Sequence, residues 1–147
     1  MTNINKRGVT VSIRALGVHR TRVPLRWRDL DHQGHVYHGT VLTLLDEART
    51  RWLRTAIGVE HPDAYVVARI EIDYQQEILM DHDAAEISIG ISRLGHSSIR
   101  TAESLTLPGG EQAARAEVVV VMWDQKAHCS RALTADERAR AEAVARA

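Results

Sequence analysis

A chain of 147 residues, of which 44% are apolar and 26% charged, has the composition of one globular domain with a sizeable core. Because its 19 Lys and Arg balance its 19 Asp and Glu, no overall field attracts nucleic acid or an anionic membrane, and we expect neither as a partner. The lack of a signal-peptide core and of a long apolar run, together with a single cysteine (Cys129), predicts a soluble cytoplasmic protein.

Residues 1–19 leave two interpretations open. The alternation of Val9, Val11 and Ile13 is typical of an edge strand. Neighbouring glycines and the terminal position favour a loosely ordered N-terminal arm instead, and we prefer the arm. In either case we expect one domain over residues 1–147, because no linker and no internal repeat divides the chain.

The stretch 21–28 alternates apolar residues with arginines, which predicts a half-buried strand. Leu25 and Trp27 belong to the set that should point inward. Pro24 has no backbone N–H to give to a neighbouring strand. We therefore expect this strand to lie at an edge of the sheet or to begin near Pro24.

A long helix is predicted over 39–57, after the polar loop 29–37. Its apolar residues recur at helical spacing and form a stripe wide enough to be wrapped by other elements. Gly58 is a natural C-terminal stop, and Pro62 prevents continuation. The charged residues are expected on the polar side of the helix, namely Asp46, Glu47, Arg49, Arg51 and Arg54.

Four further strands are expected over 64–76, 84–94, 97–107 and 111–124. The first alternates, so one face, with Ile70 and Ile72, should meet the core, and the other face should meet water or a partner. The last contains the run 118–123, which is apolar on both faces and should be central or lie at a subunit contact. A capping box at Thr134 and Glu137 opens a short C-terminal helix. This order predicts an α+β fold, with an antiparallel sheet packed around one central helix.

The loop before the helix holds the candidate chemistry. A helix N-terminus offers unpaired N–H donors that can stabilise negative charge on a carbonyl oxygen. Asp31, ionised at neutral pH, could attack a carbonyl carbon or take a proton from water. From the loop composition alone, an Asx-turn role for Asp31 is favoured, and Asp29 is interpreted as structural. His32, His35 and His38 are spaced by three, which with Asp31 could suggest a metal site.

Five segments of the chain follow one another in a specific order and spacing. They are DHQGHVYH at 31–38, DEAR at 46–49, VVARIEIDY at 66–74, RLGHSS at 93–98 and the last long strand at 119–124. Together they resemble the hotdog-fold acyl-CoA thioesterases of the 4-hydroxybenzoyl-CoA thioesterase type. The resemblance implies an antiparallel sheet of about five strands wrapped around one long central helix, with a short C-terminal helix added.

The resemblance also implies a function, the hydrolysis of an acyl-CoA thioester to a free acid and coenzyme A. It implies Asp31 as nucleophile or general base and the backbone N–H of His38 as the donor that polarises the thioester carbonyl. It implies no metal and no cofactor apart from the coenzyme A of the substrate, which counts against the histidine set as a metal site. The substrate-binding residues that we expect on this basis are Gly34, His35, Tyr37, Gly39, His96, Ser97, Ser98 and Arg100.

The resemblance implies self-association into a dimer or tetramer, with the active site at a dimer interface. The thioester could be carried by coenzyme A or by an acyl carrier protein. Ser97 and Ser98 could contact the pantetheine arm or serve only the hairpin, and Arg100 could be an ordinary strand-end charge. Relatives often have Tyr at the place of Val41 and Glu at that of Asp46, so the acyl group stays open.

Two other functions remain open. A hydratase or dehydratase acting on the same kind of thioester would pair His35 or His38 with Glu47, although this spacing matches less well than the Asp31 interpretation. A hotdog protein could also bind acyl-CoA or an acyl carrier without hydrolysis, as a sensor or scaffold. The presence of Asp31 argues moderately against such a non-enzymatic role.

Overall fold

The structure, a computed structural model, describes residues 18–147, so the alternation of Val9, Val11 and Ile13 lies outside the described residues. The strands are β1 (His19–Pro24), β2 (Tyr65–Tyr74), β3 (Ala84–Leu94), β4 (Ser98–Thr106), β5 (Gln112–Asp124) and β6 (Cys129–Ser130). The helical elements are α1 (His38–Trp52), α2 (Ala135–Arg146), the 3-10 turns η2 (Trp27–Asp29) and η4 (Met80–His82), and the π-helical turn η3 (Leu53–Ile57).

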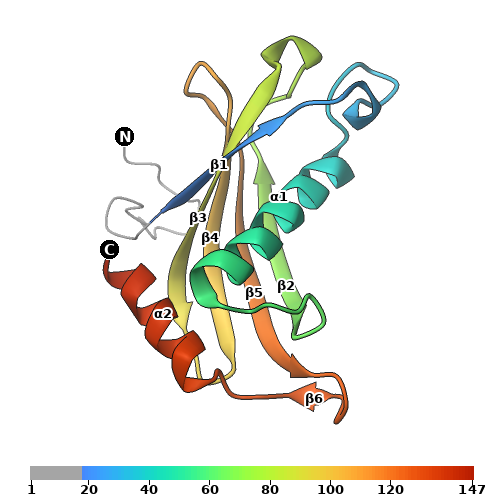
Figure 1. Ribbon diagram of the computed structural model, residues 1–147. Helices are drawn as coiled ribbons and strands as arrows, with labels where there is room; N and C mark the ends of the chain where they lie inside the picture. Colours follow the sequence, from blue (N-terminus) through green and yellow to red (C-terminus); the bar gives the residue numbers. More distant parts are fainter. Residues whose placement is uncertain (1–17) are drawn as a thin grey trace.

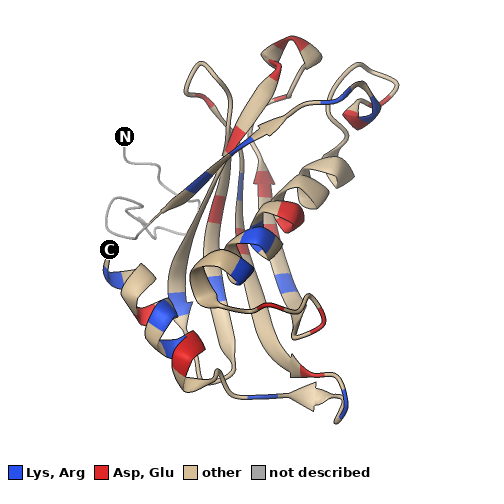
Figure 2. Cartoon of the chain, in the orientation of Figure 1, with Lys and Arg blue, Asp and Glu red and all other residues tan. Residues whose placement is uncertain are grey.

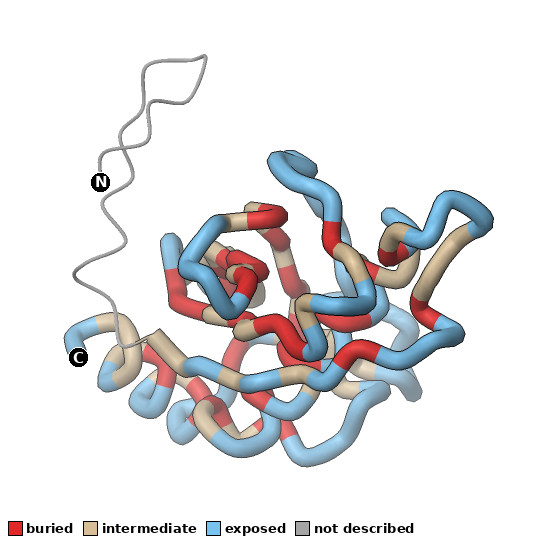
Figure 3. The backbone as a smooth tube through the Cα atoms, turned by 90° about the horizontal axis from the view of Figure 1, so that it is seen from above, coloured by how far each residue is buried: buried red, intermediate tan, exposed pale blue. Residues whose placement is uncertain are grey.

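The strands pair antiparallel in one curved sheet in the order β1-β3-β4-β5-β2, and β6 pairs with the end of β5. The helix α1 crosses one face of this sheet, and α2 packs beside β3 and η3 (Figure 1). Buried segments gather in the middle of the molecule and exposed loops surround them (Figure 3). The α+β hotdog architecture and the four strands after the helix are therefore confirmed. Among residues 18–147, no helix has the length and apolarity needed to cross a membrane.

The first strand, β1, lies at the edge of the sheet, as Pro24 predicted, but it ends at Pro24. The chain then turns, because the buried Asp29 carboxylate accepts hydrogen bonds from the backbone N–H of Arg26 at 2.8 Å and from its guanidinium. This η2 turn leaves Trp27 82% exposed, so the prediction that Trp27 points inward was wrong. The structural role expected for Asp29 is confirmed.

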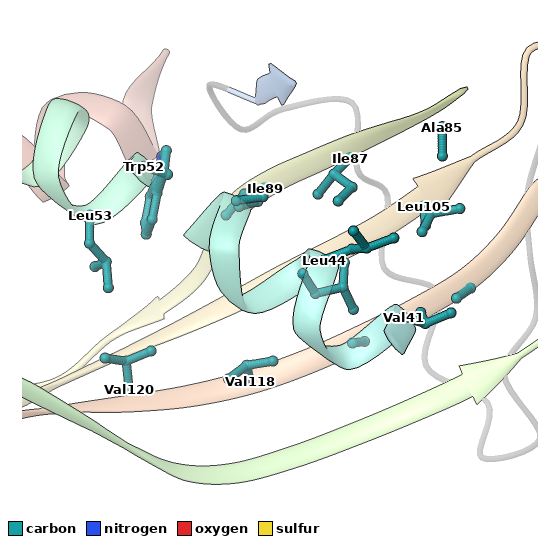
Figure 4. Close-up of a cluster of buried hydrophobic side chains, with 14 of the residues drawn as sticks. Val41, Leu44, Trp52, Leu53, Ala85, Ile87, Ile89, Leu105, Val118 and Val120 are labelled. Carbon is teal, nitrogen blue, oxygen red and sulfur yellow. The ribbon is translucent and has the colours of Figure 1, made fainter. Parts of the chain in front are cut away.

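The long helix forms where its apolar spacing predicted it, as α1 followed without interruption by η3. Side chains of Val41, Leu44 and Trp52 point from the helix onto the sheet (Figure 4). The strand residues that meet them include Ile87, Ile89, Leu105, Val118 and Val120, all of them buried. Burial of several such side chains, at about 1.5–3 kcal/mol each, is the main force that fixes the helix on the sheet.

Gly58 ends this helix with φ at +87°, a left-handed conformation that disfavours residues with a Cβ. We expect Gly58→Ala to lower the free energy of unfolding by about 1–2 kcal/mol, measured by urea denaturation. Gly58→Asn should cost less, because Asn tolerates this conformation better. If the wild type, Gly58→Ala and Gly58→Asn have the same free energy of unfolding, the left-handed conformation at position 58 does not contribute to stability.

The strand β2 differs from its prediction, because neither of its faces is fully covered by the core. It is the opposite edge strand of the sheet, and Val66, Val67, Ile70 and Tyr74 are each 36–47% exposed. The pairing with β5 shifts between Val67 and Arg69, so a bulge also interrupts the expected alternation. The prediction that one face, with Ile70, meets the core was wrong for the single chain, and the result is an exposed apolar edge.

The expected central position of the last long strand is confirmed, since β5 lies between β4 and β2. Val118 and Val120 are fully buried, whereas Val119 and Val121 on the other face are half-buried. The C-terminal helix α2 begins as predicted, with the Thr134 hydroxyl accepting a hydrogen bond from the Glu137 N–H and Glu137 bonding back to Thr134.

Arg49 corrects the expectation for the polar side of α1, because its side chain is buried. Its guanidinium donates to the Glu103 carboxylate on β4 through Nε at 2.6 Å and Nη2 at 2.9 Å. Thr101 donates to the same carboxylate at 2.7 Å, and the half-exposed Asp46 accepts from Arg49 at 2.8 Å. The helix and the sheet are thus joined by an ion pair inside an otherwise apolar layer. Figure 2 shows that the charged residues of α1 lie beyond its first turns.

Candidate active site

The loop between η2 and α1 is a small hairpin built by backbone hydrogen bonds. The N–H of Asp31 donates to the carbonyl of His35 at 2.7 Å, and Leu30 bridges Val36. Gly34 has φ at +79°, which allows the chain to reverse. The second half of the hairpin is tied to the segment after β2, because Val36 N–H donates to the carbonyl of Ile78 at 2.8 Å. The loop is therefore held at both ends.

The Asp31 carboxylate closes the tip of this hairpin. Its Oδ1 accepts the backbone N–H of Gln33 at 2.8 Å and that of His35 at 3.2 Å. Desolvation, the largest single influence, raises the pKa of Asp31, but these two N–H groups and the charges of His35 and His32 together hold it below its ordinary value. Asp31 is thus an Asx-turn acceptor and also an ionised carboxylate whose Oδ2 has no hydrogen bond from residues 18–147.

The start of α1 lies immediately after the hairpin. Within the described chain, the N–H groups of His38 and Gly39 donate to no acceptor, as expected for the first helical turn. No acidic residue occupies that turn to compete for them. The Tyr37 ring lies beside the His38 ring, with centroids 4.2 Å apart, and a Cβ at position 39 would meet the Tyr37 ring at 2.6 Å. Glycine at position 39 therefore lets the Tyr37 ring pack closely against the first turn of α1.

A pocket of about 340 Å³ lies between this helix start and the segment that follows β2. It brings together Asp31, His35 and His38 from the predicted site. The remaining lining residues are Val36, Val41, Tyr74, Gln75, Gln76, Glu77, Ile78 and Ala113. This pocket can act on a carbonyl group. The ionised carboxylate supplies a base or nucleophile, and the free helix N-terminus supplies fixed N–H donors for the carbonyl oxygen.

Tyr74 was not predicted as a site residue, yet it holds the helix start. Its hydroxyl donates to the His38 carbonyl at 2.8 Å, and the two rings meet edge to face at 6.2 Å. Burial, together with the nearby Tyr37, raises the pKa of Tyr74, so the hydroxyl stays protonated as a donor at neutral pH. No sequence pattern indicated this contact, because Tyr74 is 36 residues away along the chain.

We expect Tyr74→Phe to lower kcat/KM for the hydrolysis that the resemblance implies by about 2- to 10-fold, the equivalent of one hydrogen bond. The loss follows because the His38 carbonyl is released and the neighbouring N–H donors become less well oriented. Tyr65→Phe is the matched control, since it also removes a hydroxyl contact, to Thr50, away from this pocket. An equal loss in both variants would assign the effect to general destabilisation.

His35 is in contact with a second residue that the sequence did not indicate. Its Nε2 lies 3.0 Å from Oε2 of Glu77, and both side chains line the pocket. Backbone pairing sets this contact, because His35 bridges Leu79 on the segment after β2 that also carries Glu77. The sequence offers little indication of this contact, because Glu77 simply follows the strand predicted over 64–76 and belongs to no motif.

Gly34, Tyr37 and Gly39 lie in the hairpin or at the helix start, beside Asp31, but the other four predicted substrate-binding residues lie far from it in the same chain. His96, Ser97 and Ser98 form the β3–β4 hairpin, where Ser97 and His96 accept backbone N–H groups of Met122 and Leu133. The nine residue steps of β5 from Ala113, in the pocket, to Met122 span roughly 30 Å. Arg100, on β4, pairs with Glu117 at 3.2 Å. A single chain therefore holds the predicted site in two separate parts.

Glu47, the acid of the dehydratase alternative, points to a different place. It lines a smaller hollow of about 190 Å³ between β1 and α1, with Arg22, Arg26 and Arg51. His35 and His38 do not line that hollow. Within one chain the histidines and Glu47 therefore do not line the same hollow.

The described residues contain no group of three or more His, Cys, Asp or Glu side chains placed to hold a metal ion. The histidines spaced by three do not converge, because His35 turns to Glu77 and His38 stacks beside Tyr37 and Tyr74. His32 is exposed at the tip of the hairpin. The spacing that suggested metal ligation thus corresponds to three separate environments.

Comparison with known proteins shows that this chain is similar to thioesterases. The sequence profile described as the thioesterase-like superfamily matches residues 25–145, which is most of the chain. A thioesterase from Thermus thermophilus, solved in complex with coenzyme A and Zn, is 32% identical with a TM-score of 0.72, over 90% of this chain and 96% of that one. Among curated proteins, none matches this sequence.

Two further solved structures have comparable similarity. A candidate acyl-CoA thioesterase from Xanthomonas campestris is 30% identical with a TM-score of 0.64, over 73% of this chain and 93% of that one. The YbaW protein from Escherichia coli, described as a thioesterase candidate, is 27% identical with a TM-score of 0.72, over 86% of this chain and 98% of that one. The likeness therefore extends over nearly the whole length of each relative.

Proposed function

Because the chain belongs to the thioesterase-like superfamily and is a thioester hydrolase, we propose that it cleaves an acyl-CoA, with Asp31 as nucleophile or general base. The backbone N–H of His38, assisted by that of Gly39, polarises the thioester carbonyl. The observation that supports this assignment is the meeting of the ionised Asp31 carboxylate and the free helix start in one pocket. Coenzyme A as the carrier is supported by the relative from Thermus thermophilus, which was solved with coenzyme A bound.

The chemistry needs only groups that this chain supplies. As the carbonyl carbon is attacked, negative charge collects on its oxygen, and the N–H donors at the start of α1 stabilise that charge. The C–S bond then breaks, and the coenzyme A sulfur leaves as a thiolate that takes up a proton. Asp31 acts either by attacking the carbonyl carbon itself or by accepting the proton of the attacking water.

A dimer completes the site in this proposal. The exposed apolar edge of β2 fits a second copy that pairs antiparallel with it, so that the sheets continue across a two-fold axis. Antiparallel pairing brings the start of the partner's β2 to the end of this β2, beside the Asp31 pocket. Ser97 and Ser98 of the partner subunit would then lie two strands, roughly 10 Å, from that junction and could contact the substrate.

We expect the double variant Val67→Lys/Ile70→Lys to be monomeric, because pairing of the two edges would bury the ammonium groups of both copies close to one another. Light scattering after size-exclusion chromatography measures the mass, and thiol release should fall with the loss of the dimer. Trp27→Lys is the control, since it also replaces an exposed apolar side chain, but away from β2. A dimer that survives the double variant would place the interface elsewhere.

Thiol release from a panel of aromatic, short-chain and long-chain acyl-CoAs tests the proposed activity. The same acyl groups on an acyl carrier protein form the comparison set. Faster hydrolysis of at least one acyl-CoA supports coenzyme A as the carrier, and the ranking of the panel defines the acyl group. Hydrolysis of carrier-protein thioesters only would replace the proposed substrate, and binding of acyl-CoA without thiol release would favour the non-enzymatic alternative.

A further inference from the structure

The pocket holds a carboxylate–imidazole pair that the proposed reaction has not yet used. Glu77 Oε2 lies 3.0 Å from His35 Nε2, with the two side chains 56% and 36% exposed. A carboxylate against Nε2 fixes the proton on that nitrogen, which leaves Nδ1 as the acceptor of a neutral ring. Such an arrangement orients an imidazole as a base.

Backbone hydrogen bonds hold the segments of His35 and Glu77 together, in addition to the contact between the two side chains. His35 bridges Leu79, and the neighbouring Val36 N–H donates to Ile78 at 2.8 Å, so the two chain segments are joined on both sides of the pair. The N–H of His35 also donates to Asp31 at 3.2 Å. Backbone hydrogen bonds therefore join the hairpin that carries Asp31 and His35 to the segment that carries Glu77.

One oxygen of the Asp31 carboxylate is held and the other is free. Oδ1 accepts the N–H groups of Gln33 and His35, whereas Oδ2 has no hydrogen bond from residues 18–147. Desolvation raises the pKa of Asp31, but those N–H groups and the nearby histidines hold it below its ordinary value, so the carboxylate stays ionised. A free carboxylate oxygen in the same pocket as the helix start can attack a carbonyl carbon, and the imidazole in that pocket can then take a proton from water.

We propose that Asp31 is the nucleophile and that His35, held by Glu77, is the base that activates water in a second step. This inference rests on the proposed thioester hydrolysis. In the first step an Asp31 oxygen bonds to the acyl carbon, the C–S bond breaks and coenzyme A leaves, which produces an acid anhydride on Asp31. In the second step His35 Nδ1 takes a proton from water, and the water oxygen bonds to the acyl carbon. The bond to Asp31 breaks, the free acid leaves, and the proton passes to solvent.

In this scheme His35 is catalytic, because its ring contacts the reacting water, and Glu77 is a positioning residue that acts through His35. Removal of the Glu77 carboxylate should slow the second step and leave the first largely intact. The enzyme would then release one coenzyme A per site quickly and hold the acyl group on Asp31. A merely structural role for Glu77 would slow both steps together.

The test uses the full chain and the best acyl-CoA of the panel, with Glu77→Gln and His35→Gln beside the wild type. Rapid mixing measures the thiol burst, and intact-protein mass spectrometry after acid quench measures the acyl adduct, which peptide mapping assigns. We expect a burst near one thiol per site, an adduct on Asp31 and a steady rate on the order of 10- to 100-fold lower in the variants. Glu77→Asp should recover part of the rate, and Glu60→Gln, an exposed loop change, should leave both phases unchanged.

The outcomes separate this inference from the function on which it rests. Thiol release without any burst or adduct, in all variants, would overturn the two-step scheme and leave Asp31 as a general base. Equal loss of both phases in Glu77→Gln would overturn the role of the pair. If the wild type releases no thiol from any acyl-CoA, the proposed function and this inference both fail. If the two-step scheme holds, the Asp31→Asn protein should show neither a thiol burst nor an acyl adduct.

Discussion

The variant Asp31→Asn is expected to lower kcat for thioester hydrolysis on the order of 10²- to 10⁴-fold, the contribution typical of a positioned base or nucleophile. An amide oxygen can still accept the N–H groups of Gln33 and His35, so the hairpin should keep its shape. An amide can neither attack a thioester effectively nor accept a proton at neutral pH. The loss should therefore appear in kcat, with KM changed little, when thiol release is measured against acyl-CoA concentration.

Asp124→Asn is a matched control for this experiment. Asp124 also accepts two backbone N–H groups, from Lys126 and Ala127, each at 2.9 Å in an exposed turn. Those N–H groups, the largest influence, lower the pKa of Asp124, as the N–H groups of Gln33 and His35 lower that of Asp31. Both variants should unfold at the same temperature, and only Asp31→Asn should lose activity. Unchanged activity of Asp31→Asn would remove Asp31 from the reaction.

The second large effect concerns stability and the buried pair between α1 and β4. We expect Glu103→Ala to lower the free energy of unfolding by about 3–5 kcal/mol, because it leaves the Arg49 guanidinium buried without its counter-charge. Burial by itself lowers the pKa of Arg49, but the bond to Glu103 outweighs it and raises the pKa, so the charge persists. Urea denaturation of wild type and variant measures the loss.

Two further variants identify the cause of that loss. The double variant Arg49→Met/Glu103→Leu should cost much less than Glu103→Ala, because an apolar pair of similar volume removes both charges from the interior. Asp46→Ala removes only the half-exposed partner of Arg49 and should cost at most about 1 kcal/mol. If the double variant is as unstable as Glu103→Ala, the loss arises from packing and not from the unpaired charge.

Local sequence patterns predicted most of the fold because they depend on residues close together in the chain. The helix over 39–57, the stop at Gly58, the strand over 84–94 and the capping box at Thr134 all formed as expected. The placement of Asp31 just ahead of the helix start is also local, since the hairpin and the helix are consecutive. The family resemblance then gave this spacing a chemical meaning that composition alone did not.

What the sequence determined by itself is therefore the set of elements and the acid beside the helix start. Only the tertiary structure decided that Arg49 lies inside, that β2 is an uncovered edge and that Glu77 meets His35. These facts depend on which strands become neighbours and where the sheet ends, and periodicity along one segment carries no such information. The same reason explains why Ser97 and Ser98 lie far from Asp31 in one chain, although the motif suggested a single site.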